Sequence, residues 1–265
     1  MENQDARPTR IEAHLRLLRL ADALGPYYGT EDLAVLLYSI IRMQKPETVV
    51  ELGTGLGVSA LWMAHAAECN GLGEVYTVDD LDLWRGDDRM LSTVLSVVAR
   101  AGVGNLQASS PDEYFSAMAR MIGVEQRLIV VERRMRLDEP GHFDGYPFAK
   151  RPIGLLFSDF LHGPDHLQWL LTHFLPRMAP SSSILIDSVG SEVGSFLAIE
   201  QLVHWLNRGR IPEAMRRLWS ADAVELVRGR RLRLLHLPET KDRPQNTTSW
   251  IQVEPADPWP AGARP

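Results

Sequence analysis

The chain contains a glycine-rich turn with an acidic residue on each side of it. Gly53, Gly55 and Gly57 alternate within the segment ELGTGLG, Glu51 precedes them, and Asp79 ends the next apolar run. Glycines after a buried strand allow a tight turn and let a ligand approach the backbone, because no Cβ is in the way. In an open parallel sheet, ligands bind beyond the carboxyl ends of the strands. The turn therefore predicts a nucleotide-type ligand site.

The residues around the turn distinguish between ligands. The dinucleotide fingerprint G-x-G-x-x-G/A needs a small residue at its sixth position, and that position is Val58 here. A pyrophosphate also disfavours a nearby negative charge, yet Glu51 lies two residues before the first glycine. A ligand with a cationic amino-acid end would favour that carboxylate, and Asp79 is placed to accept hydrogen bonds from ribose hydroxyls. A nicotinamide cofactor is thus the less favoured alternative.

This arrangement, E-x-G-x-G-x-G followed by an acid, resembles motifs I and II of class I S-adenosylmethionine-dependent methyltransferases. The segment ELGTGLGVSALWMA resembles the small-molecule O-methyltransferases in particular, and the resemblance covers roughly residues 28–237. It implies a doubly wound, mostly parallel, seven-stranded α/β sheet and S-adenosylmethionine as the cofactor. It also implies a set of cofactor-binding residues, which are Glu51, Gly53, Thr54, Gly55, Gly57, Ser59, Asp79, Asp80 and Asp159.

Further candidates for chemistry follow two strands expected downstream. The segment LLFSDFLHGPDHL resembles the family's strand-four region and carries Asp159 and His162. Histidine's ordinary pKa suits proton transfer near neutrality, so His162 is a candidate general base, with Asp159 as the second catalytic candidate. The alternative is that His162 only hydrogen-bonds the loop or the cofactor.

A metal site is a second interpretation of the same region. Asp159 and Asp187 end adjacent strands, so their carboxylates could converge on Mg²⁺, which would orient an acceptor and lower the pKa of its hydroxyl. The partner acids common in metal-dependent branches are replaced here by Leu161 and Ser188. Without a metal, Asp159 would contact cofactor or substrate, and Asp187 would stabilise its loop.

The elements that must position these residues alternate between strands and helices, which predicts a doubly wound, mostly parallel sheet. Expected strands are 48–52, 74–80, 127–132, 152–160 and 183–189, and expected helices are 58–69, 88–101, 111–122, 164–178 and 192–208. The third strand has an alternative at 105–109. The runs AVELVR and RLRLLHL, which meet at Gly229 and Arg230, predict a closing antiparallel hairpin.

Domain organisation follows from composition along the chain. Residues 9–237 are expected to form a single methyltransferase domain, with tails at 1–8 and 238–265, the latter rich in proline. N-terminal helices at 9–45 form a lid or a homodimer contact, with Ile11, Leu15, Leu18 and Ala21 at helical spacing. Trp250 and Ile251 could pin part of the C-terminal tail. Residues 27–30 and the loop 133–151 are candidates for a cover over the acceptor.

Composition excludes several protein classes. The chain has 265 residues, of which 45% are hydrophobic and 23% charged, as in ordinary globular proteins. A net charge of −6 argues against nucleic-acid and anionic-membrane partners, and no apolar run is long enough to span a bilayer. A polar N-terminus without a signal peptide and the single cysteine, Cys69, fit a cytoplasmic location.

These observations predict a cytoplasmic S-adenosylmethionine-dependent methyltransferase that acts on a small molecule in specialised metabolism. By resemblance, the acceptor atom is a hydroxyl oxygen. One alternative is a catalytically inactive or regulatory cofactor-binding protein of the same fold. The other is a nicotinamide-dependent oxidoreductase.

Overall fold

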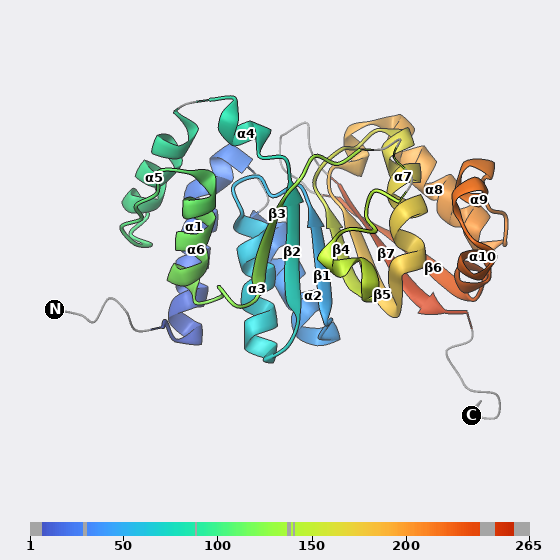
Figure 1. Ribbon diagram of the computed structural model, residues 1–265, viewed down its shortest axis with the longest axis horizontal. Coiled ribbons are helices and arrows are strands. Elements are labelled where there is room, and N and C mark those ends of the chain that lie inside the picture. The colour runs from blue at the N-terminus through green and yellow to red at the C-terminus, as the bar shows by residue number, and fades with distance from the viewer. Residues whose placement is uncertain are drawn as a thin grey trace. The chain divides into compact units, whose positions relative to one another are not determined.

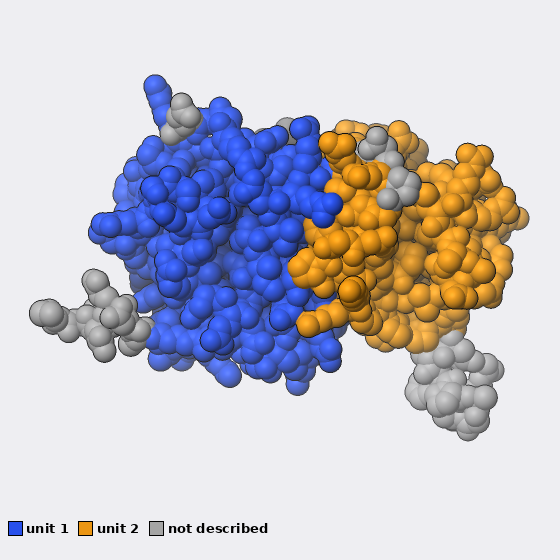
Figure 2. Space-filling model, viewed as in Figure 1, with its two compact units in different colours: residues 1–135 blue, residues 136–265 orange. Residues whose placement is uncertain are grey.

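Strands alternate with helices through most of the chain in the computed structural model. The structure describes residues 7–28, 31–87, 89–136, 139, 141–238 and 247–256. The chain divides into two units, residues 1–135 and 136–265, coloured separately in Figure 2. The predicted tail at 1–8, and the predicted cover at 27–30, lie largely outside the described residues or side chains.

Unit 1 is built on three parallel strands in the order β3-β2-β1 (Figure 1). They are β1 (Thr48–Leu52), β2 (Glu74–Asp79) and β3 (Leu128–Glu132). The helices are α1 (Arg10–Tyr28), α2 (Glu31–Gln44), α3 (Val58–Asn70), α4 (Asp82–Arg85), α5 (Met90–Arg100) and α6 (Pro111–Ile122). Every residue of β1 is buried, as its nearly continuous apolar run predicts. The third strand thus lies at 128–132, and no strand forms in the described residues at 105–109.

Helix α6 shows how the sequence sets the bounds of an element. Ser110 precedes it in extended conformation, and its side chain accepts a hydrogen bond from the Glu113 amide. Pro111 occupies the first helical position, where no amide hydrogen is needed. Gly123 ends the helix with φ +77°, in the left-handed region that favours glycine. These signals confirm the extra helix expected at 111–122.

Helix α1 buries a face that shares only Ala21 with the predicted stripe. Its inward residues are Ala13, Leu17, Leu20, Ala21 and Leu24, whereas Ile11, Leu15 and Leu18 are exposed. Both stripes satisfy helical spacing, so the sequence pattern alone does not choose between them. The choice comes from packing on α3, α5 and α6 and from Arg16, which donates to the Met121 carbonyl at 2.6 Å. The exposed stripe is the surface that the predicted dimer would use.

Unit 2 contains four strands in the order β4-β5-β7-β6. They are β4 (Ile153–Ser158), β5 (Met178–Ile186), β6 (Arg230–Leu237) and β7 (Thr248–Pro255). The helices and 3₁₀ turns are η1 (Pro147–Lys150), α7 (Pro164–Phe174), η2 (Leu175–Arg177), η3 (Val189–Ser191), α8 (Val193–Asn207), α9 (Glu213–Leu218) and α10 (Ala221–Arg228). β4 and β5 are parallel, while β7 is antiparallel to both β5 and β6.

The closing hairpin differs from the prediction in its partners. AVELVR forms helix α10, because Ser220 caps its start by accepting from the Ala223 amide. The strand that pairs with β6 comes instead from the segment expected to be a tail. Trp250 and Ile251, which were expected to pin that segment, pair with Leu185 and Ile184 of β5.

The seven strands, five of them in parallel pairings, confirm the predicted α/β fold class with its N-terminal helices. The carboxyl ends of β1, β2, β4 and β5 carry the predicted site residues. Among the described residues, no helix has the length and apolar character needed to cross a membrane.

Candidate functional site

The glycine turn connects β1 to α3. Gly53, Gly55 and Gly57 all have positive φ, at +92°, +50° and +82°, a conformation that strains residues with a Cβ. At Gly57 a Cβ would also lie 2.9 Å from the ring of Phe115. The Gly53 amide donates to the Val78 carbonyl at 2.9 Å, which ties the turn to the end of β2. Each of the three predicted glycines is therefore required by the backbone.

Asp79, at the end of β2, accepts hydrogen bonds from backbone amides of the turn. Its Oδ2 accepts from the amides of Thr54 at 2.7 Å and Gly55 at 3.4 Å, and its Oδ1 accepts from the Leu81 amide at 2.7 Å. Two carboxylate oxygens offer about four acceptor positions, so this pattern leaves capacity for a ligand hydroxyl. Asp80 is the more peripheral acid, accepting from the Asp82 amide at 3.2 Å.

Glu51 is buried beneath the turn, with 0% of its surface exposed. The Ser59 hydroxyl donates to one carboxylate oxygen, and the Thr77 hydroxyl donates to the other at 2.5 Å. Thr54 Oγ1 lies 2.6 Å from Thr77 Oγ1. Burying a carboxylate is costly unless hydrogen bonds satisfy it, so these donors make the buried charge tolerable. The network brings the predicted residues Glu51, Thr54, Ser59 and Asp79 together.

Three further residues hold the turn and were not predicted. Trp84 Nε1 donates to the Gly55 carbonyl at 3.0 Å, and the Tyr114 hydroxyl donates to the Leu56 carbonyl at 3.2 Å. Burial raises the pKa of Tyr114, which keeps its hydroxyl a donor. The third is Thr77. It could have been found by aligning the two expected parallel strands, because the register of β1 and β2 pairs it with Glu51.

In unit 2, Asp187 follows β5 and is 4% exposed. Its Oδ2 accepts from the Ser188 hydroxyl at 2.6 Å, and its Oδ1 accepts from the Thr248 hydroxyl at 3.0 Å. In the described part of the chain, no group of three or more His, Cys, Asp or Glu side chains is placed to hold a metal ion. The described residues therefore give no support to the predicted Mg²⁺ site at Asp159 and Asp187. The geometry matches the alternative that Asp187 stabilises its loop.

His162 and Asp159 follow β4, and both are half-buried. The His162 Nδ1 atom is buried and has no hydrogen-bond partner among the described residues. The main chain of His162 is anchored, because its carbonyl accepts from the Ser195 hydroxyl of α8. The predicted role of His162 as a general base stays a prediction.

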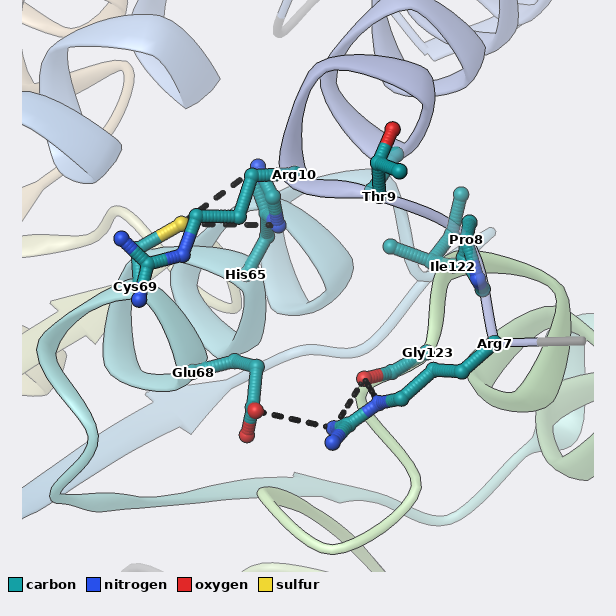
Figure 3. A pocket seen from close by; sticks show the side chains of 10 residues that line it. Arg7, Pro8, Thr9, Arg10, His65, Glu68, Cys69, Ile122 and Gly123 are labelled. Carbon is teal, nitrogen blue, oxygen red and sulfur yellow. Dashed lines mark hydrogen bonds and ion pairs between the residues drawn. The ribbon is translucent and has the colours of Figure 1, made fainter.

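A separate pocket of about 270 Å³ lies at the far end of α3 from the glycine turn (Figure 3). Arg7 lines it and reaches the Gly123 carbonyl at 2.7 Å and Glu68 at 2.9 Å. The free thiol of Cys69 lies 3.8 Å from Nε2 of His65. Burial, followed by the charge of His14, lowers the pKa of His65 to about 4, so this imidazole is neutral near pH 7. The pocket contains none of the predicted site residues.

Comparisons with solved structures find proteins of similar fold. One is the O-methyltransferase TomG from Streptomyces achromogenes, which is involved in tomaymycin synthesis and was solved with SAM. It is 18% identical to this chain, the match covers 90% of this chain and 89% of that chain, and the TM-score is 0.45. Another is an O-methyltransferase from Bacillus cereus solved with SAH, at 14% identity, 89% and 90% coverage and a TM-score of 0.46. A third is the methyltransferase PaMTH1 from Podospora anserina with SAH, at 15% identity, 91% and 88% coverage and a TM-score of 0.43.

No curated protein sequence matches this chain. A family model described as a methyltransferase domain matches residues 50–189, more than half of the 265 residues, and includes the glycine turn, Asp79, Asp159 and Asp187. The chain therefore belongs to this methyltransferase domain family, and the predicted methyltransferase is confirmed.

Proposed function

We propose that the protein transfers a methyl group from S-adenosylmethionine to a hydroxyl oxygen of a small-molecule acceptor, in specialised metabolism in the cytoplasm. The observation that carries the proposal is the pair of acids on either side of the glycine turn. Glu51 is buried and hydrogen-bonded by two hydroxyls, and Asp79 is fixed by three backbone amides. The choice of oxygen and of a small molecule rests on the resemblance of the turn segment to small-molecule O-methyltransferases.

The cofactor fits the chemistry of these residues. Glu51 supplies a negative charge for its cationic amino-acid end, with Ser59 beside it, and Asp79 has acceptor capacity left for its ribose hydroxyls. Gly53 and Gly55 would let it approach the backbone. Asp80 would assist from the following loop. When bound, S-adenosylmethionine supplies an electrophilic methyl group on a sulfonium sulfur.

The same geometry disfavours a dinucleotide. A pyrophosphate binds at such a turn through free backbone amides. Here the amides of Thr54 and Gly55 donate to the Asp79 carboxylate, whose negative charge would also repel a phosphate. This observation, together with Val58 in the turn, supports the methyltransferase over the nicotinamide-dependent oxidoreductase.

His162 would act as the general base, taking the proton from the acceptor hydroxyl onto its ring. The support is the place of His162 shortly after β4, beyond the carboxyl end of that strand, and the anchoring of its main chain by Ser195. Asp159 would contact the cofactor or the acceptor. This mechanism needs no metal ion, and the Asp187 carboxylate accepts hydrogen bonds from Ser188 and from Thr248 of β7.

The first experiment is calorimetric titration of the protein with S-adenosylhomocysteine. We expect micromolar binding, and its loss in the Glu51→Ala, Asp79→Ala double variant, which removes both carboxylates. The matched control is Asp82→Ala, because Asp82 is an exposed acid in the adjacent helix. Unchanged affinity in the double variant would contradict the proposed site.

A screen of hydroxylated small molecules then tests turnover, with and without EDTA and added Mg²⁺. We expect methyl transfer that survives EDTA and falls at least about 100-fold in His162→Ala, as general-base catalysis contributes 10²–10⁴-fold. Cofactor binding without turnover of any acceptor would favour the inactive, regulatory protein of the same fold.

A further inference from the structure

A row of hydroxyl groups links the two acids of the proposed cofactor site. Thr77 lies in the middle of β2 and is fully buried. Its Oγ1 is 2.5 Å from Oε2 of Glu51 and 2.6 Å from Oγ1 of Thr54. The backbone amide of Thr54 in turn donates to Asp79 at 2.7 Å. Hydrogen bonds on the side chain and on the backbone amide of Thr54 thus connect the two carboxylates through this one residue.

The direction of these hydrogen bonds follows from counting protons. A threonine hydroxyl carries one hydrogen and can donate only once. A carboxylate only accepts, so the Thr77 hydrogen points to Glu51, and the Thr54 hydroxyl must then donate to the Thr77 oxygen. Both oxygens of Glu51 have a hydroxyl donor, since Ser59 serves the other one. Rotation of the Glu51 carboxylate would break at least one of these bonds.

We infer that Thr77 is a positioning residue of the cofactor site. Its hydroxyl fixes the orientation of the Glu51 carboxylate. Because Thr77 also accepts from Thr54, it links Glu51 to the glycine turn whose amides donate to Asp79. This inference rests on the proposed function, because it takes Glu51 as the residue that meets the cofactor's amino-acid end. Thr77 itself acts only through Glu51 and the turn.

The test is to remove the hydroxyl and then restore it. Thr77→Val keeps the β-branched shape and deletes the donor, while Thr77→Ser keeps the donor and deletes a methyl group. The matched control is Thr48→Val, because Thr48 is equally buried in the neighbouring strand β1 and its hydroxyl has no partner among the described residues. Each variant is titrated with S-adenosylhomocysteine, and its thermal unfolding is recorded without ligand.

We expect Thr77→Val to weaken the affinity about tenfold, because a hydrogen bond to a charged group is worth that much or more. Thr77→Ser should bind within about threefold of wild type, and Thr48→Val should bind as wild type does. In a Glu51→Gln background, Thr77→Val should have less than about a threefold effect, since its action passes through the carboxylate. A structural defect would persist in that background.

Any of three results would overturn this inference but not the proposed function. They are wild-type affinity in Thr77→Val, failure of Thr77→Ser to restore binding, and a full effect of Thr77→Val in the Glu51→Gln background. Wild-type protein that does not bind S-adenosylhomocysteine would overturn the proposed function as well, so the two failures are distinguishable. If Thr77→Val does not fold, Thr54→Val and Thr54→Ser replace the pair. Thr54→Val keeps the amide bond to Asp79 and removes the donor to Thr77, and its loss of affinity should also require Glu51.

Discussion

The hydrogen bonds that Asp79 accepts from the glycine turn and from Leu81 should stabilise the protein even without a ligand. Asp79→Asn keeps the size and shape of the side chain but replaces one accepting oxygen with a donating amide group. In its better orientation, the amide oxygen keeps the bonds from Thr54 and Gly55, and the new NH₂ group faces the Leu81 amide. The substitution therefore removes one 2.7 Å hydrogen bond and sets two donors against each other.

The magnitude follows from that geometry. A hydrogen bond to a charged group contributes about 1.5–3 kcal/mol, and the two bonds that remain lose the negative charge of their acceptor. We expect Asp79→Asn to lower the free energy of unfolding by about 2 kcal/mol. For a chain of this size that corresponds to a fall in Tm of roughly 4–8 °C.

The assay is urea unfolding followed by circular dichroism, with Asp80→Asn as the control. Asp80 accepts one amide bond, at 3.2 Å, and is partly exposed, so its variant should unfold within about 0.5 kcal/mol of wild type. If the two variants were equally stable, Asp79 would not hold the turn, and the argument that its three amide bonds pre-shape the site would be wrong.

Two further predictions concern backbone strain and pH. Gly57→Ala should lower the free energy of unfolding by about 2 kcal/mol or more, because φ is +82° and the new methyl would lie 2.9 Å from Phe115. Gly71→Ala is the control, because φ is +71° there but nothing lies within 4 Å of the new methyl. Its loss in denaturant unfolding, about 1 kcal/mol, measures the backbone strain alone. Equal costs at the two glycines would refute the contact with Phe115. Burial, followed by the charge of Arg177, lowers the pKa of His173 to about 4, below its unfolded value of about 6.5. The folded state thus holds the neutral ring, and stability is lost as pH falls from about 6.5 toward 4. Between pH 7 and 5 the loss due to His173 is about 2 kcal/mol, which His173→Phe should abolish in unfolding measured at both pH values.

The parts of the fold that the sequence predicted well are those whose signal is local. β1 is apolar apart from Thr48 and Glu51 because it is buried on both faces, and in the turn after it every second residue from 53 to 57 is a glycine. Asp79 could be placed because it ends the next strand. The glycine turn and its two acids therefore followed from the sequence together.

The parts that the sequence did not predict depend on partners far away in the chain. AVELVR is short and apolar enough for a strand or a helix, and only the cap at Ser220 and its packing decide for α10. Residues 248–255 have the composition of a tail, yet they pair with β6 along their whole length and with β5 over residues 249–253. Likewise, Trp84 of α4 and Tyr114 of α6 donate hydrogen bonds to the glycine turn, and these long-range contacts have no recognisable spacing in the sequence.

The place of β7 has a consequence for how unit 2 folds during synthesis. β7 is an interior strand, between β5 and β6, although it is the last strand along the described part of the chain. Residues 187–247 separate the end of β5 from the start of β7, and at 5–20 residues per second the ribosome needs roughly 3–12 s to make them. During that time β5 has no partner on this side, and an unpaired strand edge is prone to pair with other chains. Serines in the middle of β5, Ser181–Ser183, and the arginines of β6 then make the unpaired edges of these two strands less apolar.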